Sequence, residues 1–406
     1  MKILQINVVN KILSTGRNVA EMNSYFEEKG NICATAYSKG PSTDPKSEFV
    51  IGSSLDVKVH ALLSRLFGKQ GYFSFSSTRK LLKFMDDFAP DIVVLNNLHG
   101  NYINLPMLLK YLAKKNIVTV AVLHDCWFFT GKCCHYTVDK CYRWQEDCGS
   151  CPSLKKYNVS WFFDKTPEML RDKKKLFGNI KNLAVVGVSD WLCGEAKKAP
   201  VFENARAITR IYNWIDTDFF KPADTVALRK KLGVENNKII LFAASNWTMQ
   251  KGLKTAKEVS ERLGENETML VVGNLPDGFE FNNRVIVRPR TDSMEQLIEY
   301  YSLADVFVQP SLEETFGKVI AEAEACGTPV ICFNSTANPE IVGEGCGERV
   351  APGDLDGLML AISRVLKNGR DVYSPTCRKF VIDNFNLEKS MEQYASLFEK
   401  MIKEKQ

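Results

Sequence analysis

Residues 305–340 read DVFVQPSLEETFGKVIAEAEACGTPVICFNSTANPE, and this stretch decides the fold. It opens with an apolar, β-branched run that ends at Gln309, as is typical of a strand buried on both faces. A polar turn follows, and the spacing then predicts a helix that starts near Thr315. A second apolar strand is expected at 329–334. Strand, helix and strand in this order are typical of a parallel, doubly wound α/β sheet.

The same alternation extends over the whole chain in two blocks. In the first block, strands are expected at 2–9, 32–38, 91–98, 117–124, 183–189 and 207–213, with a polar turn at 14–17 before the first helix. In the second block, strands are expected at 239–245, 268–274, 284–289, 305–311 and 329–334. We therefore predict two doubly wound domains, 1–213 and 214–386, and expect the amphipathic helix 387–406 to pack back on the first domain.

Composition excludes several classes of protein. The chain of 406 residues is 45% apolar and 25% charged, which is neither disordered nor fibrous. It has no apolar run of membrane-spanning length, and its first ten residues lack the features of a signal peptide, so we expect a cytoplasmic protein. Residues 1–200 hold 28 Lys and Arg against 18 Asp and Glu, whereas 201–406 hold 25 against 30. The first half is thus expected to face an anionic partner, with solvated helix faces as the alternative.

The turn after the strand ending at Gln309 carries the residue types of a ligand site. Ligands of open α/β sheets bind past the carboxyl ends of the strands. Free backbone N–H groups at the start of the expected helix, at Thr315–Gly317, suit an anion. Glu314 lies at the edge of this turn, and Glu322 lies just over two helical turns later on nearly the same face. Carboxylates accept hydrogen bonds from diols, although two ordinary helix residues would give the same spacing.

The motif Glu314-Thr-Phe-Gly-Lys-Val-Ile-Ala-Glu322, followed by Ala-Cys-Gly-Thr-Pro-Val, resembles the retaining GT-B glycosyltransferases of family GT4. The resemblance extends to segments 14–17, 123–131, 188–192, 211–216 and 250–252. It is closest to bacterial enzymes that build capsule, colanic acid and other exopolysaccharides. It implies a GT-B fold, in which two Rossmann-like domains face each other across a cleft. The first domain would then take the acceptor and the second the nucleotide sugar.

The resemblance also implies roles for single residues. Glu322 would bind the ribose hydroxyls, Glu314 the donor sugar, and His124 would act at the reacting sugar. The implied catalytic residues are His124, Asp125 and Glu314, and the implied donor-binding residues are Gly16, Asn213, Lys251, Thr315, Phe316, Gly317 and Glu322. The family usually has an Arg where this chain has Ser245, so Arg17 or Arg290 would replace that cation.

The expected activity is metal-independent transfer of a sugar from a UDP- or GDP-sugar to a glycan or lipid-linked acceptor, with retention of configuration. A helix N-terminus and Lys251 would stabilise the leaving diphosphate without a metal or other cofactor. Retention through front-face attack and through a covalent intermediate both stay open. A catalytically silent, sugar-nucleotide-binding scaffold is the alternative. A dinucleotide-dependent oxidoreductase is disfavoured, because the first strand is not followed by G-x-G-x-x-G.

Six of the twelve cysteines lie between Cys126 and Cys151. The spacing Cys133-x7-Cys141-x6-Cys148-x2-Cys151 ends in Cys-x2-Cys, which is typical of zinc sites. Cys134 and His135 are further candidate ligands. Packed reduced thiols and disulfides remain open as alternatives to a structural zinc.

Residues 58–84 interleave apolar and basic side chains. This pattern suits peripheral contact with an anionic membrane, at whose inner face a lipid-linked acceptor would lie. A core-facing helix pair with solvated lysines is the alternative. Nucleic acid is not an expected partner, because the sequence contains no recognised nucleic-acid-binding module.

Overall fold

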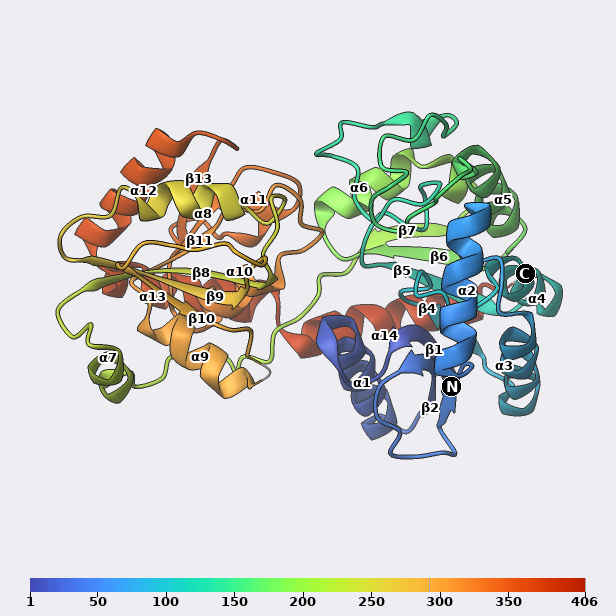
Figure 1. The fold of residues 1–406 in the computed structure, drawn as a ribbon. Helices are drawn as coiled ribbons and strands as arrows, with labels where there is room; N and C mark the ends of the chain where they lie inside the picture. Colours follow the sequence, from blue (N-terminus) through green and yellow to red (C-terminus); the bar gives the residue numbers. More distant parts are fainter. Residues whose placement is uncertain (292, 406) are drawn as a thin grey trace. The chain divides into compact units, whose positions relative to one another are not determined.

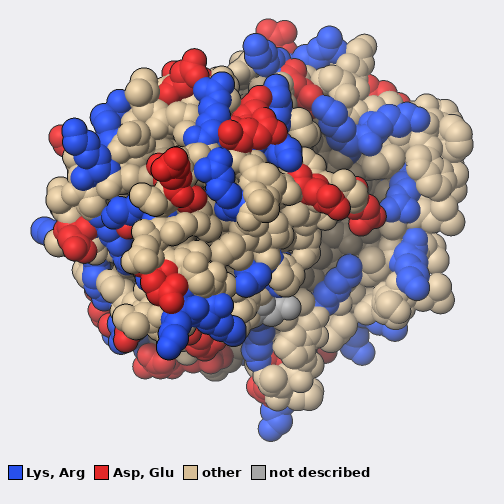
Figure 2. Space-filling model, turned by 60° about the vertical axis from the view of Figure 1, so that its left-hand side comes forward, with Lys and Arg blue, Asp and Glu red and all other residues tan. Residues whose placement is uncertain are grey.

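The computed structural model describes residues 1–291 and 293–405, which form two compact units. Unit 1 comprises Met1–Ile211 and Met391–Gln406, and unit 2 comprises Tyr212–Ser390. Each unit contains one sheet in which every recorded strand pairing is parallel, with helices on its faces (Figure 1). The prediction of two doubly wound parallel sheets is confirmed. Lys and Arg side chains alternate with Asp and Glu over the face shown in Figure 2, so charge of one sign does not dominate there.

The sheet of unit 1 has seven strands in the order β3-β2-β1-β4-β5-β6-β7. The strands are β1 (Lys2–Val9), β2 (Ile32–Lys39), β3 (Glu48–Val50), β4 (Ile92–Leu95), β5 (Val118–Leu123), β6 (Leu183–Gly187) and β7 (Ala207–Arg210). The helices are α1 (Leu13–Glu28), α2 (Ser54–Phe67), α3 (Phe75–Phe88), α4 (Leu105–Lys115), α5 (Thr166–Gly178), α6 (Asp190–Lys198) and α14 (Leu387–Lys403). Central strands β4, β5 and β6 are buried throughout, which explains their continuous apolar runs.

The sheet of unit 2 has six strands in the order β10-β9-β8-β11-β12-β13. The strands are β8 (Lys238–Asn246), β9 (Glu267–Asn274), β10 (Val285–Arg288), β11 (Val306–Gln309), β12 (Val330–Phe333) and β13 (Gly347–Val350). The helices are α7 (Val226–Leu232), α8 (Leu253–Ser260), α9 (Met294–Leu303), α10 (Lys318–Ala325), α11 (Asn338–Ile341), α12 (Leu355–Asn368) and α13 (Arg370–Asn384). The short strands β3 and β13 were not expected from the sequence.

The strand order reverses once in each sheet, between β1 and β4 in unit 1 and between β8 and β11 in unit 2. At such a switch point the connections leave in opposite directions and open a crevice at the carboxyl ends of the strands. The segments that follow β1, β4, β8 and β11 are therefore the places where each unit can hold a ligand.

Two local predictions were wrong. Helix α1 begins at Leu13, so residues 14–17 lie in its first turns, because the chain already bends at Lys11 and Leu13, where φ is 60° and 56°. Helix α10 begins at Lys318 and not near Thr315, because Gly317 adopts a φ of 75°, which a right-handed helix excludes.

Helix α14 belongs mainly to unit 1. Its Phe398 is fully buried and stacks on Phe26 of α1, with ring centroids 5.3 Å apart. Arg206 also donates a hydrogen bond to the backbone carbonyl of Glu404. Gln406, the last residue of the expected helix, lies outside the described residues. Among the described helices, none combines the length and apolar character needed to cross a membrane.

We expect Phe398→Ala to lower the free energy of unfolding of unit 1 by about 3–5 kcal/mol, because it removes a fully buried ring and leaves a cavity. Denaturant unfolding followed by circular dichroism measures this change. Lys400→Ala on the exposed face of the same helix is the matched control and should change stability by less than about 0.5 kcal/mol. Equal stability of the two variants would contradict the packing role of α14.

Candidate functional site

An ion pair lies at the switch point of unit 2. Lys251 follows β8 and Glu314 follows β11, and Lys251 Nζ lies 2.6 Å from Glu314 Oε1. Gln309 Nε2 donates to the same carboxylate oxygen at 3.1 Å. The Lys251 side chain is 37% exposed and that of Glu314 is 15% exposed. The pair therefore combines a fixed position with access from solvent.

The turn at Gly252 holds this pair in place. Gly252 adopts a φ of 82°, and a Cβ added there would lie 2.5 Å from atoms of Pro310. The backbone of Leu312 donates to the carbonyl of Gln250 at 2.8 Å, which ties the loop after β8 to the loop after β11. Only glycine allows both the left-handed turn and this close approach. The Gln-Lys-Gly sequence thus places Lys251 beside Glu314.

Glu314 is also anchored through its backbone. Its N–H donates to Thr336 Oγ1 at 2.8 Å, and its carbonyl accepts from the N–H of Ala337 at 3.2 Å. Ser335 Oγ donates to the carbonyl of Leu312 at 2.6 Å. The loop after β12 therefore supports the loop that carries Glu314, so the carboxylate sits on a rigid base.

Thr315, Phe316 and Gly317 form the link between this loop and α10. The ring of Phe316 is buried against Tyr212 and Phe385, with centroid distances of 6.0 and 5.3 Å. Asn213 follows Tyr212 directly and is 9% exposed. The contact between the Tyr212 and Phe316 rings thus places Asn213 near Gly317. The two residues are far apart in sequence, so the sequence alone did not show this proximity.

Glu322 lies on α10 and is 4% exposed. Its Oε2 accepts a hydrogen bond from the hydroxyl of Tyr301 on α9 at 3.2 Å. Ser245 lies exposed at the end of β8. Trp247 is buried in the core, and its N–H groups bond to Asn274 and Val272, so this ring supports the loop from inside.

In unit 1, His124 follows β5 and contacts the strand beside it. His124 Nε2 lies 2.9 Å from Asn96 Oδ1, and Asn96 Nδ2 donates to Gln5 Oε1 at 3.3 Å. An amide oxygen only accepts, so Nε2 of His124 donates here. This chain of contacts runs from the carboxyl ends of β5 and β4 to Gln5 in the middle of β1. Gly16 lies in α1, where an added Cβ would come within 3.1 Å of Lys11 N.

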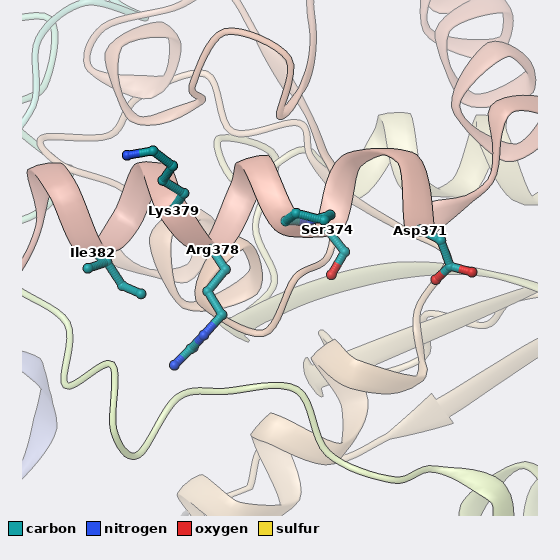
Figure 3. A pocket seen from close by; sticks show the side chains of 6 residues that line it. Asp371, Ser374, Arg378, Lys379 and Ile382 are labelled. Carbon is teal, nitrogen blue, oxygen red and sulfur yellow. The ribbon is translucent and has the colours of Figure 1, made fainter.

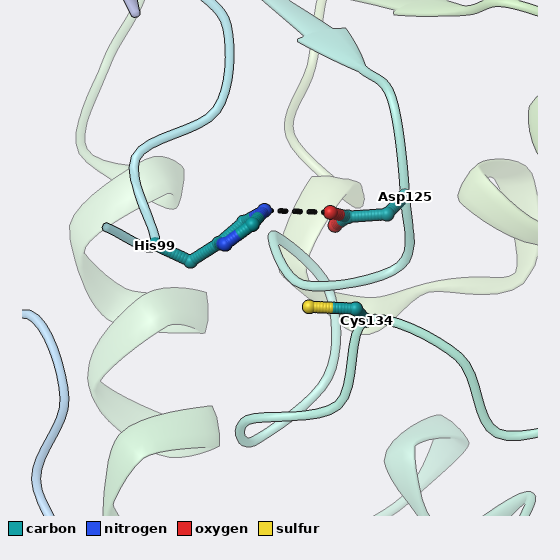
Figure 4. Close-up of side chains that lie close together, drawn as sticks. All are labelled: His99, Asp125 and Cys134. Atoms are coloured by element: carbon teal, nitrogen blue, oxygen red, sulfur yellow. Dashed lines mark ion pairs between the residues drawn. The ribbon is translucent and has the colours of Figure 1, made fainter. Parts of the chain in front are cut away.

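Asp125 forms a cluster with His99 and Cys134 (Figure 4). Asp125 Oδ2 lies 2.7 Å from His99 Nε2, and Asp125 Oδ1 accepts from the N–H of Trp127 at 2.8 Å. Burial raises the pKa of Asp125, but the charge of His99 overrides this and holds it at about 2. Burial alone would lower the pKa of His99. The negative charge of Asp125 outweighs burial, so the pKa of His99 is raised overall.

The sequence places the segment 96–99 past a strand end, where a ligand site is expected, but it assigns no role to His99. The signal was present, because His99 lies in the segment that follows the strand 91–98 beside the switch point. Its partner, however, is 26 positions away on another loop, and only the register of β4 against β5 brings the two together.

A buried cation supports the loop after Asp125. Lys173 of α5 is 2% exposed, and its Nζ donates to the carbonyls of Trp127 and Thr130 at 2.5 and 2.9 Å. It also lies 3.8 Å from the centre of the Trp127 ring. Burial lowers the pKa of Lys173 to about 7. The lysine thus fixes the backbone that leaves the Asp125 cluster.

A cavity of about 590 Å³ lies elsewhere in unit 2 along α13 (Figure 3). It is lined by Asp371, Ser374, Pro375, Arg378, Lys379 and Ile382. Arg378 donates to the carbonyls of Phe220, Ala325 and Thr217, so it braces neighbouring loops. None of the lining residues was predicted as a site residue, and the cavity has no carboxylate–lysine pair of the kind found at Lys251.

Comparison with known proteins finds a family that matches part of the chain. Residues 224–383, which lie within unit 2, match the family described as "Glycosyl transferases group 1". The N-acetyl-alpha-D-glucosaminyl L-malate synthase of Bacillus anthracis is 26% identical over 237 residues, which are 55% of this chain and 61% of that protein. This chain thus matches less than two thirds of the length of that curated relative. The predicted resemblance to group 1 glycosyltransferases is confirmed for this segment.

Two solved structures resemble the whole chain. The sucrose-phosphate synthase of Thermosynechococcus elongatus superposes with a TM-score of 0.70 at 17% identity, over 98% of each chain. HepE of Anabaena, solved in complex with UDP and glucose, gives a TM-score of 0.67 at 16% identity over 98% of this chain and 100% of that one. At these identities the likeness establishes the fold, which is GT-B with two Rossmann-like sheets.

The His99–Asp125 pair leads to a pH-dependent prediction. His99→Ala should destabilise unit 1 by about 1.5–3 kcal/mol, the range of a hydrogen bond to a charged group. The pKa of His99 is raised in the folded state. The contribution of His99 to the free energy of unfolding is therefore complete below about pH 6.5, and it is lost as the pH rises through the folded-state pKa. The contribution of Asp125 to the free energy of unfolding is present above about pH 3.9, and it is lost as the pH falls toward 2.

Denaturant unfolding of both proteins from pH 5 to pH 9 measures this effect. The difference between wild type and His99→Ala should be largest at acidic pH and should shrink toward pH 9. His135→Ala, which changes a second histidine of the same unit, is the matched control. A difference that does not vary with pH would show that His99 contributes through packing alone.

Proposed function

We propose that this chain is a retaining glycosyltransferase that moves a sugar from a nucleotide-sugar donor to a glycan or lipid-linked oligosaccharide acceptor in the synthesis of cell-surface polysaccharide. One observation carries the proposal. The Lys251–Glu314 pair lies at the switch point of unit 2, within the segment that matches the group 1 glycosyltransferases. This is where a Rossmann-like sheet binds a nucleotide.

The charges of this pair suit the expected reaction. Cleavage of the glycosyl–phosphate bond leaves negative charge on the diphosphate. Lys251 would stabilise that charge together with the N–H groups of Thr315, Phe316 and Gly317, which precede α10. A bound diphosphate gives Lys251 a second anionic partner, and Glu314 would then be able to accept hydrogen bonds from the donor sugar. This arrangement requires no divalent metal.

The remaining residues of unit 2 are assigned to the nucleoside. Glu322 has two carboxylate oxygens, of which Oε2 accepts from Tyr301. We assign the ribose hydroxyls to Glu322, with Tyr301 fixing the orientation of the carboxylate. Asn213, held next to Phe316 through Tyr212, would line the donor site.

In unit 1 we assign His124 to the reacting sugar, where its ring would offer a hydrogen bond to a hydroxyl. Asp125 would line the same site, held by His99 and by the N–H of Trp127. Gly16, packed closely against the turn after β1, would let that turn approach the phosphates.

A UDP-sugar is the proposed donor, because HepE, which shares the fold, was solved with UDP and glucose. A GDP-sugar is the alternative tested beside it. The alternative function is a catalytically silent protein that binds a sugar nucleotide. The exposed Ser245, at the position where related enzymes carry a cation, is the observation that favours it.

An acceptor in the membrane is supported by one surface of unit 1. Helix α2 exposes a stripe of apolar side chains, and the segment 161–163 lies at its C-terminal end, where Trp161 N–H donates to the carbonyl of Arg65 at 2.8 Å. The exposed apolar residues of this surface are Leu55, Val59, Leu62, Phe67, Trp161, Phe162 and Phe163. Lys58 and Arg65 lie on the same helix. We propose that this α2 surface rests on an anionic lipid layer at the inner face of the cytoplasmic membrane.

Donor binding tests the assignment of Glu322. Glu322→Ala should weaken binding of the donor roughly 10- to 150-fold, because a diol loses a charged acceptor worth about 1.5–3 kcal/mol. Calorimetry with UDP-glucose and GDP-mannose measures it. Glu344→Ala, at an exposed position in the same unit, is the matched control and should bind as wild type does. Unchanged affinity in Glu322→Ala would remove this residue from the donor site.

The rate of donor hydrolysis distinguishes a glycosyltransferase from a catalytically silent protein that only binds the sugar nucleotide. The wild type should slowly hydrolyse its preferred donor, and added Mg²⁺ or Mn²⁺ should not raise the rate. Lys251→Ala should lower this rate at least 100-fold, the scale found when a group that stabilises transition-state charge is removed. Lys254→Ala, one turn into α8 and exposed, is the control. Tight donor binding without any hydrolysis or transfer would favour the scaffold.

Vesicle binding tests the α2 surface. The wild type should sediment with vesicles that contain phosphatidylglycerol and less with vesicles of phosphatidylcholine alone. Leu62→Glu and Phe162→Glu should each reduce sedimentation several-fold, because each places a carboxylate in the apolar surface. Val226→Glu, at an equally exposed apolar position on α7 in unit 2, is the matched control. Equal binding of all variants would show that another surface meets the lipid.

A further inference from the structure

The segment from His124 to Lys165 joins β5 to α5 and contains one short helix, Arg143–Gln145, as its regular structure. Loops of this length without secondary structure are uncommon in compact domains. Small loop-rich regions usually need a disulfide or a metal ion, because they bury too little apolar surface to hold their shape. Yet Lys132, Tyr136 and Trp144 of this loop are buried. Aromatic packing holds part of the loop, since the buried Trp144 ring contacts Phe129 and Tyr136 at centroid distances of 4.8 and 5.3 Å.

Four thiols of this loop surround one small cavity. Cys133, Cys141, Cys148 and Cys151 all line a cavity of about 20 Å³, together with Lys132, Tyr136, Arg143 and Trp144. A volume of this size admits a single small atom or ion. The thiols of Cys133 and Cys151 are close enough to form a hydrogen bond with each other. Cysteines from three separate parts of the loop therefore line one cavity.

Backbone donors are aimed at two of these sulfur atoms. The N–H of Ser153 bonds to the Cys151 sulfur and the N–H of Gly131 bonds to the Cys148 sulfur. Arg143 donates to the carbonyls of Gly149 and Ser150 and so closes the turn between Cys148 and Cys151.

These thiols differ from the other cysteines of the chain. Cys33, Cys193, Cys326, Cys332, Cys346 and Cys377 are buried on or beside regular elements. The four loop cysteines are instead half-buried and lie among polar and basic side chains. Simple apolar packing of thiols does not account for that environment.

We propose that Cys133, Cys141, Cys148 and Cys151 bind one structural zinc ion. Four cysteines, two of them in a Cys-x2-Cys turn, are the usual ligands of structural zinc, with zinc–sulfur distances of about 2.3 Å. Among the described residues, the group whose ligand atoms all lie within 4.8 Å of one another is His99, Asp125 and Cys134, so no three of the four loop sulfurs are that close together. Binding of zinc would require the four sulfurs to move inward around the cavity. The His99–Asp125–Cys134 group is not the proposed site, because its carboxylate is already paired with His99 and Trp127.

The ion would brace the loop that leaves the end of β5. Cys134 lies beside Asp125 and is the chain neighbour of the ligand Cys133. The backbone of Cys126 also bonds to the carbonyl of Cys134 at 2.9 Å. Zinc at the four thiols would therefore limit the motion of the segment that contacts Asp125, and it would do so without touching a substrate.

Metal analysis of the full chain, made without a histidine tag, tests the proposal. The wild type should contain about one zinc per chain, since four thiolates bind one ion. Cys148→Ser and Cys151→Ser should lose it. Cys134→Ser and Cys332→Ser are the matched controls and should keep it. Reconstitution with Co²⁺ should give the intense visible bands of tetrahedral thiolate coordination in the wild type and in both controls.

Alkylation keeps the test decisive if the serine variants do not fold. In the wild type with zinc, N-ethylmaleimide should spare the four loop thiols, and a chelator should expose all four together, as read by peptide mass spectrometry. A wild type that takes up neither zinc nor Co²⁺ would overturn the proposal. Loss of metal in Cys134→Ser but not in Cys148→Ser would also overturn it, as would a disulfide between Cys133 and Cys151 in protein purified under reducing conditions.

Discussion

The close contact between Gly252 and Pro310 is the constraint on which unit 2 depends. An added Cβ at Gly252 would lie 2.5 Å from Pro310, so the loop after β8 lies directly on the loop after β11. That contact fixes Lys251 next to Glu314 and allows the Leu312–Gln250 hydrogen bond. A residue with a side chain at position 252 would separate the two loops, and the charge pair at the switch point would be lost with them.

Unit 1 reaches a comparable result by different means. Its polar residues at the carboxyl ends of β4 and β5 are held by side-chain pairs, His124 with Asn96 and Asp125 with His99. Lys173 then holds the loop that follows, through two backbone carbonyls. Because buried charges are costly unless they are paired, each of these groups constrains the next. The loop is thereby organised from the strand end outward, and the proposed zinc would hold its far half.

The two units therefore divide the chemistry that we propose. Unit 2 presents a cation, two carboxylates and backbone N–H groups, which suit a nucleoside diphosphate sugar. Unit 1 presents a histidine and an aspartate on strand ends and an apolar, basic surface on α2. The two solved structures share this fold at low identity.

The sequence by itself determined the two parallel sheets and most of their strands, because strands buried on both faces are nearly continuous apolar runs, as 91–98 and 117–124 are. It also determined the positions of Glu314, Glu322 and Lys251 past strand ends. Only the tertiary structure decided that Lys251 pairs with Glu314 and Asp125 with His99, since these partners lie far apart in sequence. Only the tertiary structure also showed where α1 and α10 begin. The left-handed backbone at Leu13 and Gly317 is set by the packing of each turn, and it does not change the hydrophobic periodicity of the sequence.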